Sequence, residues 1–132
     1  MTLLVPDAGE VKMLGNILNK TTPENIVYRL YSNNITPAET DTAATYTEVS
    51  GSGYAAITLT GANWTITGGA PTTATYALQT WTFSGAAGNV YGYYTTEATS
   101  GVIKWAERAT GAPINIATAG SKIEITPSIS LD

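Results

Sequence analysis

The sequence of 132 residues contains no cysteine and no histidine. Without cysteine the chain can form no disulfides and cannot use thiolate chemistry. Without histidine it lacks the commonest metal ligand and the commonest general base. Charged residues make up only 12% of the chain, about half the usual ~25% of globular domains. These absences favour a protein that binds or builds structures over one that catalyses a reaction.

Basic residues are few, and they are scattered. The net charge is −4, and the six basic residues are Lys12, Lys20, Arg29, Lys104, Arg108 and Lys122. Because binding to nucleic acid needs concentrated positive charge, we expect no nucleic-acid partner.

Long apolar runs are also missing, so we expect no segment that spans a membrane. The first residues, MTLLVPDAGEV, have no basic region and no long apolar region. We therefore expect no signal peptide and synthesis in a cytoplasm. The length is that of one domain with a core of its own.

Threonine is abundant, with 23 residues, and 43% of the chain is hydrophobic. Short alternating segments follow one another, separated by turns rich in Gly, Pro, Asn and Thr at a spacing of roughly ten residues. The pattern predicts an all-β fold, a jelly-roll-like β-sandwich of about nine antiparallel strands with one short N-terminal helix. The predicted strands lie near residues 26–32, 45–49, 54–60, 62–67, 73–83, 90–94, 102–109, 114–117 and 122–126.

The segment Thr73–Tyr94 is the densest aromatic part of the chain. It reads as two strands joined by a turn at Gly85–Gly88, with Trp81 and Phe83 on one face of the first strand. We predict that it forms the central hairpin of the fold.

Residues 1–22 are predicted to form an N-terminal arm and helix, and residues 23–132 the β-sandwich domain. Asp7 is expected to cap the helix, together with Glu10 three residues later. The candidate interface residues are the apolar residues of the arm and of one helix face: Leu3, Leu4, Val5, Val11, Leu14 and Leu18. Two interpretations remain open: the segment closes one end of the β core, or it reaches a neighbouring subunit.

Carboxylates offer the only catalytic chemistry worth weighing. Two of them suffice for a glycosidase, and Glu48, Glu97, Glu107 and Glu124 are the candidates. Strand alternation points most of them outward, so we predict that the protein is not an enzyme and uses no cofactor. The loop that holds Glu39 and Asp41 has too few acids for a convincing calcium site, and whether it binds an ion is left open.

Four aromatic residues form a candidate contact surface: Tyr91, Tyr93, Tyr94 and Trp105. Exposed Tyr and Trp stack on sugars and anchor protein partners. Core packing is the alternative explanation, because aromatic side chains dominate burial in cores.

Several stretches together carry a resemblance: LLVPDAGEVKMLGNILNK, YRLYSNNITPAETDTAATYTEV, GYAAITLTGANWTI, ALQTWTFSG, VYGYYTTEATSGVIKWAER and IEITPSISL. Over nearly its whole length the chain resembles small structural proteins of tailed bacteriophages. The resemblance carries over no functional residues.

It implies a place in the virion, most simply as a capsid decoration (cement) protein bound to the major capsid protein or to other virion proteins. The alternative is a tail or fibre module that binds a host-surface glycan. Because local three-fold sites abound on icosahedral shells, we expect a homo-oligomer, with a trimer favoured.

Overall fold

A computed structural model describes residues 3–131. The described chain contains one α-helix, α1 (Asp7–Ile17), and two 3₁₀ turns, η1 (Ala43–Thr45) and η2 (Gly61–Asn63). Its eleven strands are β1 (Ile26–Tyr31), β2 (Ile57–Leu59), β3 (Thr65–Thr67), β4 (Thr72–Thr75), β5 (Gln79–Thr82), β6 (Gly88–Val90), β7 (Gly92–Glu97), β8 (Ile103–Arg108), β9 (Ile114–Ile116), β10 (Lys122–Ile125) and β11 (Ser128–Leu131).

The largest sheet has the strand order β2-β1-β7-β8 and is antiparallel throughout. The side chains of its inner strand β1 alternate, with Tyr28 and Leu30 on one face and Val27 and Tyr31 on the other. Both faces are buried, because a different hydrophobic cluster covers each of them.

Residues 72–131 form one long hairpin that is folded over on itself, called here the folded hairpin. Its two arms stay paired along their length in four groups: β4 with β11, β5 with β10, β6 with β9, and β7 with β8. The hairpin turns at residues 98–101, where the backbone N–H of Glu97 donates to Val102 (2.9 Å).

The predicted hairpin within Thr73–Tyr94 is therefore wrong. Those residues run along a single arm, and the strands of this arm pair with strands of the other arm, as Thr82 does with Lys122. A local turn signal at Gly85–Gly88 is satisfied equally well by a bend within one arm, and only the long-range pairing distinguishes the two.

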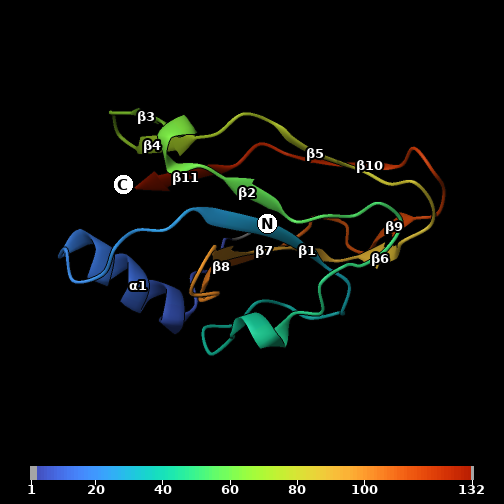
Figure 1. Ribbon diagram of the computed structural model, residues 1–132, viewed down its shortest axis with the longest axis horizontal. Helices are drawn as coiled ribbons and strands as arrows, with labels where there is room; N and C mark the ends of the chain where they lie inside the picture. Colours follow the sequence, from blue (N-terminus) through green and yellow to red (C-terminus); the bar gives the residue numbers. More distant parts are fainter. Residues whose placement is uncertain (1–2, 132) are drawn as a thin grey trace.

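The strands lie in two layers (Figure 1). One layer is the four-stranded sheet; the other contains β3, β4, β11, β5 and β10. The main core lies between them and consists of Tyr28, Leu30, Val49, Leu59, Trp81, Phe83, Val90, Tyr93, Trp105, Ile116 and Ile123. A second cluster lies on the other face of the four-stranded sheet and consists of Tyr31, Tyr46, Tyr94, Ile103 and Ala106.

The all-β fold with one short N-terminal helix is confirmed. The described strands number eleven where about nine were predicted, and they form four hydrogen-bonded groups, so the jelly-roll-like sandwich topology stays a prediction. The strand predicted at 45–49 is reduced to a single bridge between Tyr31 and Glu48.

Helix α1 packs against β8. Gly9 makes this approach possible, since a Cβ atom at that position would lie 2.3 Å from the carbonyl oxygen of Lys104. The predicted cap is wrong: Pro6 occupies the N-cap position, and Asp7 is already helical. The carbonyl of Pro6 accepts from the N–H groups of Gly9 and Glu10 (2.7 and 3.0 Å). Proline suits this position because its fixed φ matches the extended backbone before the helix, and no hydrogen bond of the helix needs the N–H that proline lacks.

Candidate functional site

The side of α1 that faces away from the sheet carries four large apolar side chains. Val11, Leu14, Ile17 and Leu18 are 70, 59, 78 and 65% exposed, and we call them the outer helix face. Three of them are predicted interface residues. They do not close the end of the β core, so that interpretation of the helix is wrong for these side chains. A group of large apolar side chains left in water on one helix is typical of a contact surface.

A buried ion cluster fixes the opposite side of the helix to the sheet. The Glu97 side chain is 1% exposed, and its carboxylate lies 3.0 Å from Lys12 Nζ and 3.4 Å from Lys104 Nζ. The hydroxyl of Ser100 donates to the same carboxylate. Burial alone would raise the pKa of Glu97, but the hydrogen bonds of Ser100 and Lys12 and the charge of Lys104 outweigh it and lower the pKa.

The tip of the folded hairpin is held by a second carboxylate. Glu24 accepts hydrogen bonds from the backbone N–H groups of Thr99 (2.6 Å) and Ser100 (3.0 Å). These two bonds lower the pKa of Glu24. They fix the tip of the hairpin to the segment that joins α1 to β1.

The N-terminal arm lies against its own chain. Leu4 bridges to Ala106 on the open edge of β8, with N–O distances of 3.0 and 2.9 Å. Leu3 and Val5 are half-buried against the main core. These three predicted interface residues therefore make intramolecular contacts, because the open edge of β8 offers unpaired backbone groups that the arm covers.

The predicted aromatic contact surface is wrong for three of its four members. Tyr93, Tyr94 and Trp105 are buried, and the ring of Tyr93 stacks on Tyr28 with a centroid distance of 5.1 Å. Alternation along β7 sends Tyr93 and Tyr94 to opposite faces, but each face has its own hydrophobic cover.

The fourth member, Tyr91, is half-buried, with the Arg108 guanidinium carbon 5.2 Å from its ring centroid. Arg108 also donates to the carbonyl of Ile35 (2.6 Å). These positions do not form an exposed stacking platform for a sugar.

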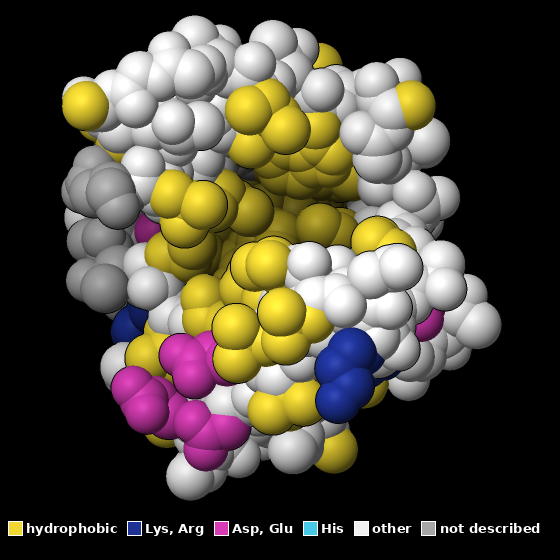
Figure 2. Space-filling view, turned by 90° about the vertical axis from the view of Figure 1, so that its left-hand side faces the viewer, with side chains coloured by type: hydrophobic (Ala, Val, Ile, Leu, Met, Phe, Trp, Pro, Cys, Tyr) yellow, Lys and Arg dark blue, Asp and Glu magenta, His cyan; other side chains and the backbone are white. Residues whose placement is uncertain are grey.

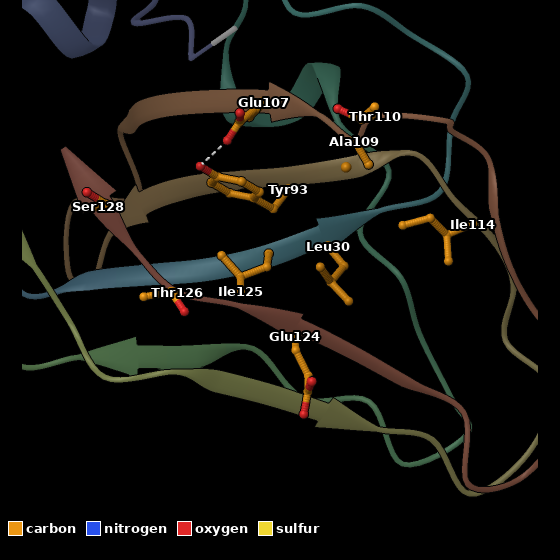
Figure 3. Close-up of a pocket in the computed structure, with 11 residues that line it drawn as sticks. Leu30, Tyr93, Glu107, Ala109, Thr110, Ile114, Glu124, Ile125, Thr126 and Ser128 are labelled. Carbon is orange, nitrogen blue, oxygen red and sulfur yellow. Dashed lines mark hydrogen bonds between the residues drawn. The ribbon is translucent and has the colours of Figure 1, made fainter. Parts of the chain in front are cut away.

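A cleft of about 510 Å³ lies between β8 and the ribbon of β10 and β11, and we call it the interlayer cleft (Figure 3). Apolar side chains of Leu30, Tyr93, Ile114 and Ile125 line it. Polar residues also border it, namely Glu107, Thr110, Glu124, Thr126 and Ser128. A cleft of this size with an apolar lining and a few polar groups matches ligand sites in general.

One carboxylate is held toward the cleft by a tyrosine. Tyr93 and Glu107 are cross-strand partners, and the Tyr93 hydroxyl donates to Glu107 Oε2 at 2.6 Å (Figure 3). Burial, followed by the hydrogen bond to Glu107, raises the pKa of Tyr93 far above its usual value of 10.0. The phenol therefore stays protonated and acts as the donor.

The four acids considered for a glycosidase are not brought together as a pair. Glu124 borders the cleft, but its side chain points away from Glu107 and accepts from Thr80 Oγ1 at 3.3 Å (Figure 3). Glu48 pairs with Arg29 (2.8 Å) and accepts from the Tyr54 hydroxyl (3.0 Å). Glu97 belongs to the cluster beneath α1.

In the loop that holds Glu39 and Asp41, Asp41 Oδ2 accepts from Ala38 N (2.9 Å) and from the Tyr46 hydroxyl (2.8 Å). Within residues 3–131, no group of three or more Asp, Glu, His or Cys side chains could hold a metal ion. The described part of the chain also has no helix long and apolar enough to cross a membrane.

The end of the molecule that carries β3 and β4 is hollowed. Figure 2 shows apolar side chains gathered in this hollow between the two layers, with the charged side chains of that view mostly below it.

The spacing of apolar residues in the sequence predicted the outer helix face, but no sequence pattern predicted the interlayer cleft. Residues of β1, β7, β8 and β10 line this cleft, and no local pattern marks the approach of strands so far apart in the chain.

Comparison of the chain with family models, curated proteins and solved structures found no match.

Proposed function

We propose that the protein is a structural assembly module, a capsid decoration protein of a phage virion, that attaches to the assembled shell through the outer helix face. The observation that carries the proposal is the exposure of Val11, Leu14, Ile17 and Leu18 on one side of α1. The virion setting rests on the resemblance described above.

The energetics support a contact at this face. Full burial of each such side chain contributes roughly 1.5–3 kcal/mol relative to exposure. The helix is already fixed by Gly9 against β8 and by Lys12 on buried Glu97, so little ordering remains for the binding step. A protein that binds only the assembled shell stabilises the shell against disassembly by mass action.

The test mixes purified protein with undecorated shells and measures bound protein and the temperature of genome release. We expect saturable binding and a raised release temperature. Replacing Leu14 and Ile17 together by Gln should weaken binding by at least about tenfold. Ile66→Gln is the matched control, since Ile66 is 73% exposed on β3, away from the helix. Failure of the unmodified protein to bind shells would overturn the proposal.

Self-association is a further part of this proposal and leaves the outer helix face free to bind the shell. A homotrimer places three outer helix faces in a symmetric arrangement that matches a local three-fold site on a shell. Sedimentation of the unmodified protein and of the Leu14→Gln/Ile17→Gln variant tests this part. We expect a trimer for both proteins. A monomeric unmodified protein would overturn this part, and a monomeric variant would show that the outer helix face is buried in the trimer and is not free for the shell.

A further inference from the structure

The interlayer cleft is bordered by strands that have an unused edge. Among the described strands, β10 pairs only with β5, and β11 pairs only with β4. Ile125, Thr126 and Ser128 of this ribbon also line the cleft. Unpaired edge groups are a template for an additional strand. An extended segment added there would send alternate side chains to the same side, two positions apart.

The charge of the cleft is acidic. Neither lysine nor arginine lines it, and Glu107 faces into it from the inner side of β8 (Figure 3). The three ion pairs found among the described residues do not involve Glu107. The Tyr93 hydroxyl holds Oε2, so the carboxylate has a fixed orientation and can accept further hydrogen bonds through Oε1. Its natural counterpart is a basic side chain.

The space next to Glu107 is apolar. Leu30, Ile114 and Ile125 surround the cleft below the carboxylate (Figure 3). The volume of about 510 Å³ is large enough for two side chains of an extended segment. The lining therefore matches an apolar side chain followed, two positions later, by a basic one.

We propose that the interlayer cleft binds an extended segment of the partner protein, which adds to the β10–β11 edge and places an apolar side chain in the cleft and a lysine against Glu107. This rests on the proposed function, since the partner is the protein of the shell. It adds a second, polar contact to the one made by the outer helix face, and it defines the chemistry of the segment that is bound.

The probe is a capped hexapeptide of threonines that contains one isoleucine and, two positions later, one lysine. Binding is measured by titration into isotope-labelled protein, with the amide signals of β8, β10 and β11 followed by NMR. We expect saturable shifts confined to these strands. The same peptide with norleucine in place of lysine should bind at least about tenfold more weakly, because the charged hydrogen bond is lost.

Two protein variants sharpen the result. Glu107→Gln should weaken the lysine peptide by about tenfold and leave the norleucine peptide unchanged. Glu124→Gln is the matched control, because Glu124 borders the same cleft with its side chain turned away, and it should change affinity by less than about twofold. Should Glu107→Gln fail to fold, the two peptides compared on the unmodified protein still decide the question.

Absence of saturable binding, equal affinity of the two peptides, or shifts outside the cleft strands would overturn the inference. Its failure is separable from that of the proposed function. Shell binding that depends on Leu14 and Ile17 while the peptide does not bind rejects the cleft alone, and loss of shell binding by the unmodified protein rejects the proposed function.

Discussion

Helix α1 and the folded hairpin differ in where their large apolar side chains point. In the hairpin, Trp81, Phe83 and Trp105 point between the layers and are buried. In the helix, the four side chains of the outer face are exposed to water, and the side that meets the sheet uses Gly9, the half-buried Met13 and the ion pair of Lys12 with Glu97. The hairpin therefore buries its large apolar side chains within the fold, whereas the helix leaves the apolar side chains of its outer face exposed.

The largest expected effect comes from the core of the folded hairpin. Trp105 is 1% exposed, so Trp105→Ala removes a fully buried ring and leaves a cavity. We expect the free energy of unfolding to fall by about 3–5 kcal/mol. Denaturant unfolding followed by circular dichroism measures this. A loss below about 1 kcal/mol would contradict the picture of a tightly packed core.

Breaking the ion cluster under α1 should lower the free energy of unfolding by a somewhat smaller amount. Glu97→Gln leaves Lys12 and the buried Lys104 without their counter-charge, for an expected loss of about 3 kcal/mol. Thermal and denaturant unfolding at neutral pH measure the change. A variant as stable as the unmodified protein would show that the cluster contributes nothing to holding the helix.

The same cluster makes stability depend on pH. In the folded protein the pKa of Glu97 lies below its usual value of 4.5, so folding favours the ionised form. Its contribution is fully present above the unfolded value of 4.5 and is lost as the pH falls through the folded pKa. Glu24 acts in the same direction. We expect the loss of stability at acid pH to be smaller in Glu97→Gln; equal pH dependence in the two proteins would rule out this assignment.

A smaller effect is expected where the helix touches the sheet. In Gly9→Ala, the new methyl group meets the backbone carbonyl of Lys104 at 2.3 Å, and backbone cannot move aside as a flexible side chain can. We expect a loss of about 1–3 kcal/mol. Gly15→Ala is the comparison, since the three atoms nearest to its Cβ would all belong to the side chain of Thr21. Equal losses in the two variants would show that the helix moves away from β8 at little cost.

The smallest effect belongs to the outer helix face. Leu14 is 59% exposed, and Leu14→Ala should change the free energy of unfolding by less than about 0.5 kcal/mol while weakening shell binding. Unfolding and shell binding are measured on the same preparation. A large loss of stability in the isolated protein would mean that the residue packs within its own chain, and the contrast between helix and hairpin would fail.

The sequence by itself determined which residues share a face. Alternation separated Tyr28 and Leu30 from Val27 and Tyr31 and grouped Trp81 with Phe83, and helical spacing grouped Val11, Leu14 and Leu18. These periods follow from local backbone geometry, which each short segment carries independently. The all-β class and the single short N-terminal helix followed from the same periods.

Only the tertiary structure decided what covers each face. It paired the arm of residues 72–97 with residues 103–131, buried Tyr93, Tyr94 and Trp105, laid Leu4 on the edge of β8, and turned the apolar side of α1 outward. A periodic pattern shows which residues of a segment share a face, but it does not show which distant segment packs against that face. The packing partner is selected by contacts between residues far apart in the chain, such as Lys12 with Glu97. These contacts stabilise the protein only when the whole fold is formed.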